Sequence, residues 1–160
     1  MQKFYLSKSS LTVINTLKSL KEKSLIKDIQ KLSAQNARIE FSKIRAYFSY
    51  KKNIDVLIKK DFKIENIPVR YYRGKNKSKN EVLPIMVYFH GGGWVLGNVD
   101  THDQVCSILA NKGKYDLISV EYSLAPEAIF PKAINESKKI LKSISQNKYG
   151  LKINNKKIIL

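Results

Sequence analysis

The chain has 160 residues, of which 43% are hydrophobic, and it contains 30 Lys and Arg residues against 13 Asp and Glu residues. This composition is typical of a globular domain and excludes a disordered polymer and a membrane-embedded bundle. The net charge of +17 would attract polyanions, but the lysines are scattered and only four residues are arginine: Arg38, Arg45, Arg70 and Arg73. Because recognition of bases and phosphates favours the planar arginine fork, we expect no specific nucleic-acid partner.

The chain carries no pattern typical of membrane insertion or export. No apolar run approaches the roughly 20 residues that a transmembrane helix needs. Residues 1–24 lack the compact apolar segment and the cleavage site of a signal peptide. The single cysteine, Cys106, can form no internal disulfide, which suits a reducing compartment. We therefore predict a cytoplasmic chain with no membrane span.

Two amphipathic helices are predicted first in the chain. Apolar residues spaced mostly three and four apart predict a helix over residues 11–32, with an apolar face of Leu11, Ile14, Leu17, Leu25, Ile29 and Leu32. Ser33 is a suitable N-cap for a second helix, whose apolar face would be Ala37, Phe41, Ile44 and Phe48. Both helices need a surface to pack against.

The next segments are predicted to be strands. Residues 61–65 and 67–73 alternate apolar and polar side chains, which predicts a hairpin around residues 66–68. Residues 83–89, "LPIMVYF", are continuously apolar, as in a strand that is buried on both faces of a parallel sheet. Residues 116–122 and 156–160 are predicted to be two further buried strands.

A helix is predicted between each pair of these buried strands. Asp100 or Thr101 would cap the first helix, Val105 and Leu109 would face inward, and Gly113 would end it. Pro131 would open the second helix, which ends near Asn147 and has inward residues Ile134, Ile140, Leu141 and Ile144. Alternating strands and helices predict an α/β fold with a parallel sheet.

Three consecutive glycines follow the first buried strand, in the sequence "HGGGW" (residues 90–94). Ligands bind at the carboxyl ends of strands in open α/β sheets, and glycines let the backbone approach a ligand closely. The spacing is not that of a phosphate-binding loop, since neither G-x-G-x-x-G nor G-x-x-x-x-G-K occurs. The N–H groups of this loop could therefore converge on a developing negative charge. A tight turn that merely needs glycine is the alternative.

Two motifs in register resemble a known family. "HGGGWVLGNVDTHD" (90–103) and "VEYSLAPEAIFPKAI" (120–134) are similar to motifs of the hormone-sensitive-lipase group of α/β-hydrolase carboxylesterases. The resemblance runs from about residue 32 to residue 160. It implies the amino-terminal part of an α/β-hydrolase fold, a mostly parallel sheet flanked by helices and preceded by cap-type helices. We therefore expect a helical cap-like segment over residues 1–50 and an incomplete α/β-hydrolase core over residues 51–160.

The resemblance also implies roles for the loop residues. In this family the loop supplies backbone N–H groups to an oxyanion hole, and the donors here would be Gly92 and Gly93. His90 and Gly91 would shape the loop, and Trp94 would begin the wall of the pocket. The expected substrates are short- to medium-chain acyl esters, and no cofactor or metal is implied.

Two departures from the family motifs are visible. Ser123 stands where the family has arginine, which removes a charged partner for Glu127 and its surroundings. The G-x-S-x-G nucleophile elbow is also absent from the 160 residues. The elbow would begin just after residues 156–160, so nucleophile, acid and base are all expected to lie outside this chain. We therefore predict little or no turnover by the chain alone, and a marginally stable or partner-dependent monomer.

No substitute nucleophile or base is evident. His102, at a predicted helix start, is expected to be structural, and Cys106 is expected to be a small core residue. No cluster of His, Cys and carboxylate residues has the spacing of metal ligands. Three interpretations therefore remain: an amino-terminal esterase segment that is inactive alone, one subunit of a two-chain esterase whose second chain carries the triad, and a non-enzymatic basic binding module.

Overall fold

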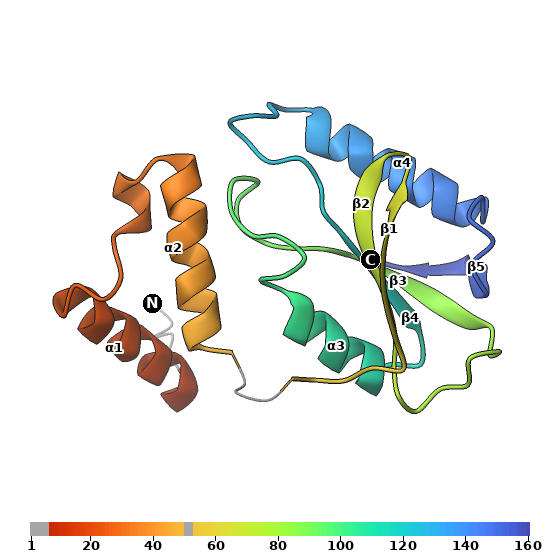
Figure 1. The fold of residues 1–160 in the computed structure, drawn as a ribbon, viewed down its shortest axis with the longest axis horizontal. Coiled ribbons are helices and arrows are strands. Elements are labelled where there is room, and N and C mark those ends of the chain that lie inside the picture. The colour runs from red at the N-terminus through yellow and green to blue at the C-terminus, as the bar shows by residue number, and fades with distance from the viewer. Residues whose placement is uncertain (1–6, 50–52) are drawn as a thin grey trace, which may run out of the picture.

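A computed structural model describes residues 7–49 and 53–160, which form a helical segment lying beside an α/β core (Figure 1). The helical segment contains α1 (Lys8–Glu22), a short 3-10 helix η1 (Ile29–Lys31) and α2 (Ala34–Tyr47). Helix α2 lies between α1 and the core in the view of Figure 1. The boundary expected between residues 50 and 51 falls outside the described residues.

The core is built on one five-stranded sheet in the order β1-β2-β4-β3-β5. The strands are β1 (Ile58–Ile64), β2 (Ile67–Arg73), β3 (Leu83–Phe89), β4 (Asp116–Val120) and β5 (Ile153–Ile159). Strand β2 is antiparallel to both of its neighbours, whereas β3 pairs in parallel with β4 and with β5. Four of the five strands therefore point the same way, and the predicted α/β class with a mostly parallel sheet is confirmed.

Helices α3 (Asp103–Lys112) and α4 (Lys132–Ser145) cover opposite faces of the sheet (Figure 1). Because side chains alternate along a strand, each strand contributes to both faces. In β4, Ile118 packs in the cluster that includes Ile140 and Ile144 of α4, whereas Leu117 packs with Cys106 and other residues of the α3 side. The two continuous apolar runs expected to be buried on both faces, β3 and β4, therefore form the centre of the sheet.

The single helix predicted over residues 11–32 is wrong, because α1 ends at Glu22. Ser24 has φ of +56°, and the N–H of Leu25 donates to the carbonyl of Leu20 at 2.9 Å. This is the arrangement of a Schellman C-cap, in which a residue with positive φ reverses the chain. Glycine usually occupies that position, so a serine there does not predict the end of a helix. Leu25 is consequently exposed.

The remaining helix boundaries were predicted with mixed success. Ser33 is the N-cap of α2, and Gly113 is the C-cap of α3, as predicted. The N-cap of α3 is His102 and not Asp100 or Thr101, because the Thr101 hydroxyl is hydrogen-bonded to the backbone of residue 98 and the Asp100 carboxylate pairs with an arginine of β2. Helix α4 begins at Lys132 with Pro131 as its N-cap, one residue after the predicted start at Pro131.

One side chain and one strand that were predicted to be buried are exposed. Ile134 in the first turn of α4 is 40% exposed, and it lines surface pockets instead of the core. Strand β5 was predicted to be buried, but it forms an edge of the sheet, and Lys156, Lys157 and Ile159 are exposed. Among the described strands β5 pairs only with β3, so one row of its backbone groups has no strand beside it.

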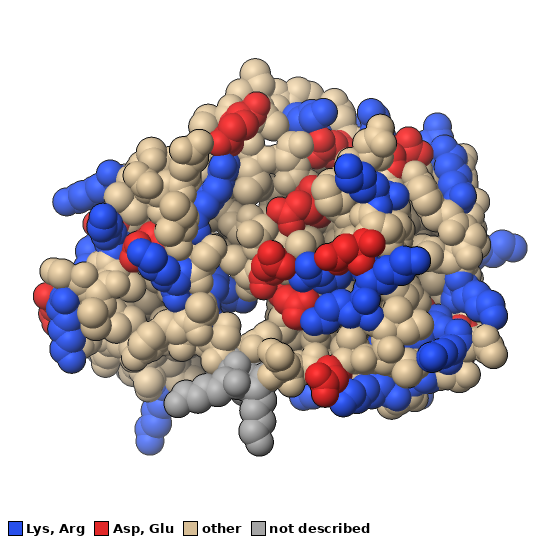
Figure 2. All heavy atoms as spheres, in the orientation of Figure 1, with Lys and Arg blue, Asp and Glu red and all other residues tan. Residues whose placement is uncertain are grey.

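Charge is spread over the face of the molecule shown in Figure 2. Lys and Arg side chains occur on both the helical segment and the core, with Asp and Glu between them. Arg70 alone pairs with three carboxylates, those of Asp61, Asp100 and Asp103. None of the helices in residues 7–49 and 53–160 has the length and apolar character needed to cross a bilayer.

Candidate active site

The loop that follows β3 turns sharply because four of its residues have positive φ: Gly92 (+140°), Gly93 (+61°), Trp94 (+59°) and Gly97 (+88°). The carbonyl of Gly92 accepts hydrogen bonds from the N–H groups of Val95 (3.2 Å) and Leu96 (2.9 Å). A Cβ atom on Gly92 would lie 1.9 Å from the carbonyl oxygen of Leu96. Only glycine is therefore compatible with this close turn at position 92.

The turn leaves several backbone donors without acceptors among the described residues, including those of Gly92 and Gly93. Within the described residues, the N–H groups of Gly92 and Gly93 make no hydrogen bond. A Cβ atom on Gly93 would meet nothing within 4 Å, so that side of the loop is open. Both glycines line a pocket of about 270 Å³, together with Phe89, His90, Gly91, Trp94, Tyr122, Ala133, Ile134 and Ser137. All five residues singled out in the sequence, 90–94, thus meet at one pocket.

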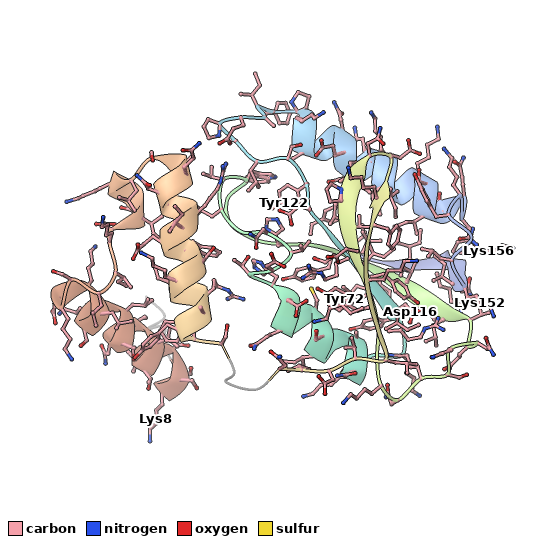
Figure 3. All side chains as sticks on the ribbon, viewed as in Figure 1. Lys8, Tyr72, Asp116, Tyr122, Lys152 and Lys156 are labelled. Atoms are coloured by element: carbon pink, nitrogen blue, oxygen red, sulfur yellow. The ribbon has the colours of Figure 1, made fainter. Side chains whose placement is uncertain are left out.

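His90 is buried and contacts the start of the loop. Its side chain is 3% exposed, and its Nδ1 lies 3.0 Å from the carbonyl oxygen of Gly91. Its ring stacks on Tyr122 (centroids 4.4 Å apart) and on His102 (5.3 Å). The Tyr122 hydroxyl, labelled in Figure 3, donates to the carbonyl of His90 at 2.5 Å. The start of the loop is therefore fixed by an aromatic stack and a buried hydrogen bond.

Neither His102 nor Cys106 is prepared for catalysis. Burial lowers the pKa of His102, and its Nδ1 is occupied by contacts with Thr101 (3.0 Å) and the carbonyl of Asn98 (3.2 Å). Burial raises the pKa of the Cys106 thiol to about 12, so the thiolate nucleophile is not formed near neutral pH. Residues 7–49 and 53–160 hold no group of three or more His, Cys, Asp or Glu residues placed to bind a metal ion.

An arginine that the sequence analysis did not single out ties α2 to this loop. The Arg38 guanidinium donates to the carbonyl oxygens of Val95 (2.8 Å) and Ala125 (2.7 Å). It also makes a bidentate pair with Glu127 (2.8 and 2.7 Å), and its hydrogen bond lowers the pKa of that carboxyl to about 2. One feature of the sequence could have pointed to Arg38. Glu127 has serine instead of arginine at position 123, so it needed a cationic partner from elsewhere in the chain.

Ser123 has a different partner in the folded chain. Its N–H and its hydroxyl both donate to the carboxylate of Glu136, at 2.8 and 2.7 Å. Although burial raises the pKa of Glu136, these hydrogen bonds and Lys132 lower it overall. The corner left without arginine at 123 is thus held by Arg38 on one side and by Glu136 on the other.

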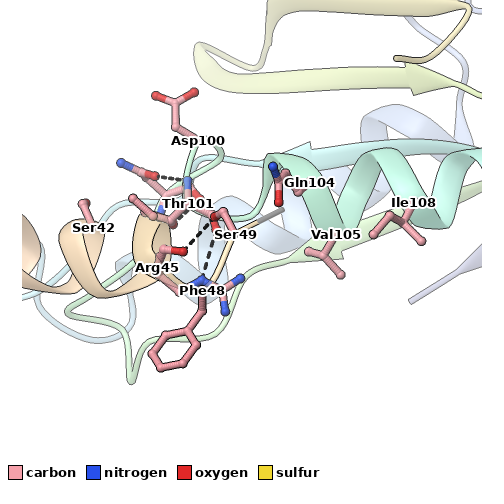
Figure 4. Close-up of a pocket in the computed structure, with 11 residues that line it drawn as sticks. Ser42, Arg45, Phe48, Ser49, Asp100, Thr101, Gln104, Val105 and Ile108 are labelled. Atoms are coloured by element: carbon pink, nitrogen blue, oxygen red, sulfur yellow. Dashed lines mark hydrogen bonds between the residues drawn. The ribbon is translucent and has the colours of Figure 1, made fainter. Parts of the chain in front are cut away.

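A second pocket, of about 520 Å³, lies between α2 and α3 (Figure 4). Its lining includes Ser42, Arg45, Phe48, Asp100 and Gln104. The Arg45 Nε donates to the carbonyl of Thr101 at 3.2 Å, which joins the carboxyl end of α2 to the core. None of the residues of the glycine loop lines it. It is larger than the glycine-loop pocket, but it does not present the two open N–H groups.

Exposed apolar side chains occur in the glycine loop and in the segment before α4. Trp94, Ile129 and Phe130 are 64%, 76% and 81% exposed. An apolar pocket of about 330 Å³ adjoins the glycine-loop pocket and shares Trp94, Ala133 and Ile134 with it. Such a concentration of exposed apolar surface is typical of a binding groove or an interface with another polypeptide.

Comparison with known proteins shows that this chain is similar to α/β hydrolases. Residues 86–160 match the family model of the alpha/beta hydrolase fold. The carboxylesterase NlhH of Mycobacterium tuberculosis is 42% identical over 84 residues, which are 52% of this chain and 26% of that enzyme. The putative alpha/beta hydrolase R526 of Acanthamoeba polyphaga mimivirus is 32% identical over 133 residues, 81% of this chain and 37% of that protein.

Solved structures of esterases have the same fold. The structure of a hyperthermophilic esterase from the archaeon Pyrobaculum calidifontis matches with a TM-score of 0.83 and 32% identity, over 97% of this chain and 48% of that one. The chain therefore spans about half the length of that esterase and a smaller share of the two sequence relatives. The described fold is that of the matched portion.

Proposed function

We propose that this chain, which is similar to the hormone-sensitive-lipase type of α/β-hydrolase carboxylesterases, supplies the oxyanion-hole half of a serine esterase site. The observation that carries the proposal is the pair of N–H groups on Gly92 and Gly93, which lack acceptors among the described residues and line the 270 Å³ pocket. Their role would be to bind the substrate oxygen that becomes negatively charged during acyl transfer.

The chemistry requires donors that are in place before the reaction. Attack on an ester carbonyl places negative charge on its oxygen, and fixed N–H groups stabilise that charge without reorganising. The stack of His90 on Tyr122 and the hydrogen bonds to the Gly92 carbonyl supply this rigidity. The apolar side chains of Phe89, Trp94 and Ile134 would contact the hydrocarbon part of the ester. Short- to medium-chain acyl esters are the proposed substrates.

The nucleophile, the acid and the base are assigned to polypeptide outside these 160 residues, which contain no G-x-S-x-G. Loss of a triad nucleophile typically lowers turnover by about 10⁶, although an oxyanion hole and substrate binding alone retain about 10³–10⁴ over water. The 160-residue chain is therefore proposed to be inactive alone. Residues 7–49 are proposed to be part of a cap over the site.

A two-chain esterase is the second candidate, and it would use the edge of the sheet. Strand β5 pairs in parallel with β3 on one side and with no described strand on the other. An unpaired edge accepts a strand from another polypeptide. A second chain that carries the G-x-S-x-G elbow could add its strand here and would cover Ile159 and Leu160, which are exposed.

The test is hydrolysis of p-nitrophenyl butyrate by the chain alone, and by the chain co-expressed with the carboxyl-terminal half of a matched esterase that carries the triad. We expect no saturable hydrolysis by the chain alone and saturable hydrolysis by the co-expressed pair. In the pair, Gly93→Pro removes one donor and should lower kcat by about 10²–10³.

Gly150→Pro is the matched control. Gly150 has φ of +59°, close to the +61° of Gly93, and a Cβ atom on it also meets nothing within 4 Å. The two substitutions therefore impose the same conflict in φ. Gly150→Pro also removes the N–H that donates to the carbonyl of Asn147 at 3.2 Å, but Gly150 does not line the 270 Å³ pocket. Equal losses of kcat in the two variants would overturn the assignment of Gly93 as a donor. Saturable hydrolysis by the chain alone that Gly93→Pro abolishes would contradict the proposed inactivity.

A further inference from the structure

One arginine of the helical segment holds two loops of the core together. Arg38 projects from α2 and uses its Nε and both terminal nitrogens in hydrogen bonds of 2.7–2.8 Å. Its acceptors, on Val95, Ala125 and Glu127, lie 57 to 89 residues further along the chain. Lysine could not replace these bonds, since only the planar guanidinium presents donors in several fixed directions.

The bond to Val95 acts directly on the glycine loop. Val95 follows Gly93 by two residues, and its own N–H donates to the carbonyl of Gly92. The bond to Ala125 acts on the same loop from the other side, because the N–H of Ala125 donates to the carbonyl of Trp94 at 2.8 Å. Arg38 thus binds two carbonyl groups whose residues are hydrogen-bonded to the backbone at Gly92 and Trp94, on either side of Gly93.

An ion pair with Glu127 alone would not explain this geometry. Exposed ion pairs contribute little to stability, and the Glu127 side chain is 53% exposed. The Arg38 side chain is only 27% exposed, and two of its four hydrogen bonds go to backbone carbonyls. Backbone carbonyls carry no net charge to attract a cation from a distance, so these bonds fix position more than they add attraction.

We propose that Arg38 is a positioning residue, through which α2 sets the orientation of the Gly92 and Gly93 donors by holding the Val95 and Ala125 carbonyls. The inference rests on the proposed oxyanion role of the loop. The helical segment would then help to position the site, although none of the described residues in 7–49 lines the 270 Å³ pocket. It also accounts for the tolerance of serine at position 123, because Glu127 obtains its guanidinium partner from α2.

The test measures the loop directly and needs no turnover. Amide hydrogen exchange at Val95, Leu96 and Ala125 reports the hydrogen bonds that close the loop. Trp94 is the single tryptophan of the chain, so its fluorescence and its quenching by acrylamide report the loop alone. In Arg38→Gln we expect roughly tenfold faster exchange at these three amides and stronger quenching of Trp94.

Arg45→Gln is the matched control, since Arg45 lies on the same helix and also donates to a core carbonyl, that of Thr101. It should leave the loop amides and Trp94 quenching unchanged. Ile118 and Val120 of β4 serve as internal references, because global destabilisation would accelerate their exchange as well. If Arg38→Gln and Arg45→Gln change the loop equally, the proposal is overturned.

Two further variants separate position from charge. Arg38→Lys keeps the cation beside Glu127 but loses the fork, and the loop amides should exchange faster, as in Arg38→Gln. Glu127→Gln removes the ion pair but leaves the carbonyl bonds, and the loop should stay protected. The opposite pattern, a closed loop in Arg38→Lys and an open one in Glu127→Gln, would overturn the proposal. Should Arg38→Gln fail to fold, these two variants still decide the question.

The outcome is also separable from the proposed esterase function. In the co-expressed active pair, Arg38→Lys should lower kcat while KM changes little, because the donors act mainly in the transition state. If the loop opens but kcat is unchanged, the positioning role holds and the oxyanion assignment fails. If Gly93→Pro lowers kcat but Arg38→Lys leaves the loop unchanged, the oxyanion assignment holds and the positioning role of Arg38 fails.

Discussion

Several side chains of this chain owe their properties to burial and partners that lie far away in the sequence. Arg73 and Asp116 are both buried, and the Arg73 Nε donates to the Asp116 carboxylate at 3.0 Å. The Tyr71 hydroxyl donates to the same carboxylate at 2.7 Å, and Figure 3 places Asp116 inside the core. A buried charge is tolerated only when it is paired in this way. Burial also disfavours the charged form of His102, which lowers the pKa of its imidazole.

His102 predicts how stability depends on pH. Burial lowers the pKa of this imidazole below its ordinary value of 6.5, and the neighbouring Arg45 and His90 add to that effect. Between the lowered pKa and 6.5 the unfolded chain binds a proton that the folded chain does not. Its contribution to the free energy of unfolding should therefore be complete above pH 6.5 and should fall as the pH drops below that value.

Urea denaturation between pH 8 and pH 5.5 measures this effect. The His102→Asn variant lacks the titrating group, so its midpoint should decline less over this range than that of the unmodified chain. Parallel declines in the two proteins would show that other groups are responsible.

At the scale of single elements, local sequence determines where α2 begins but not where α1 ends. Ser33 caps α2 through its hydroxyl, which accepts from the N–H of Asn36 at 3.4 Å. The end of α1 instead depends on Ser24 with positive φ, a conformation that serine rarely adopts. The chain reversal after α1 is stabilised by backbone hydrogen bonds, such as that from Leu25 to Leu20, which the spacing of apolar residues does not predict. Helix α2 matters most here because it carries Arg38.

Replacing the cap should weaken α2. Ser33→Ala removes the acceptor for the first turn and should lower the free energy of unfolding by about 1 kcal/mol. Ser42→Ala is the control on the same helix. The Ser42 hydroxyl donates back to the carbonyl of Arg38 at 2.9 Å, a mid-helix bond that does not favour the helix. Urea midpoints measured by circular dichroism should fall for Ser33→Ala and stay nearly constant for Ser42→Ala; the reverse order would contradict the capping role.

At the scale of the whole molecule, the sheet has an open edge and an uncovered apolar surface. Strand β5 ends in Ile159, which is 37% exposed, and the following Leu160 is 77% exposed. Trp94 and Phe130 are exposed at the site. Parallel edge strands with apolar side chains favour association with other polypeptides. The positive net charge opposes association at low salt, since like-charged copies repel one another.

The isolated chain is therefore expected to self-associate, and to do so more at 0.5 M salt than at low salt. Ile159→Lys places a charge on the edge and should shift the population toward monomer. Val82→Lys is a suitable control, because Val82 is 62% exposed and precedes β3. Light scattering with size-exclusion chromatography measures the mass. A monodisperse monomer that unfolds cooperatively in urea at both salt concentrations would contradict this expectation.

The sequence by itself determined the α/β class, the strands β3 and β4, the cap of α2 and the glycine loop. These features depend on short-range rules, namely continuous apolar runs, capping residues and a motif whose backbone demands glycine. The tertiary structure decided which residues support the loop. Arg38 reaches Val95 and Glu127 across 57 and 89 residues, and β5 became an exposed edge because of its place in the sheet order. Such contacts depend on how elements pack, and packing brings together residues whose spacing along the chain carries no periodic signal.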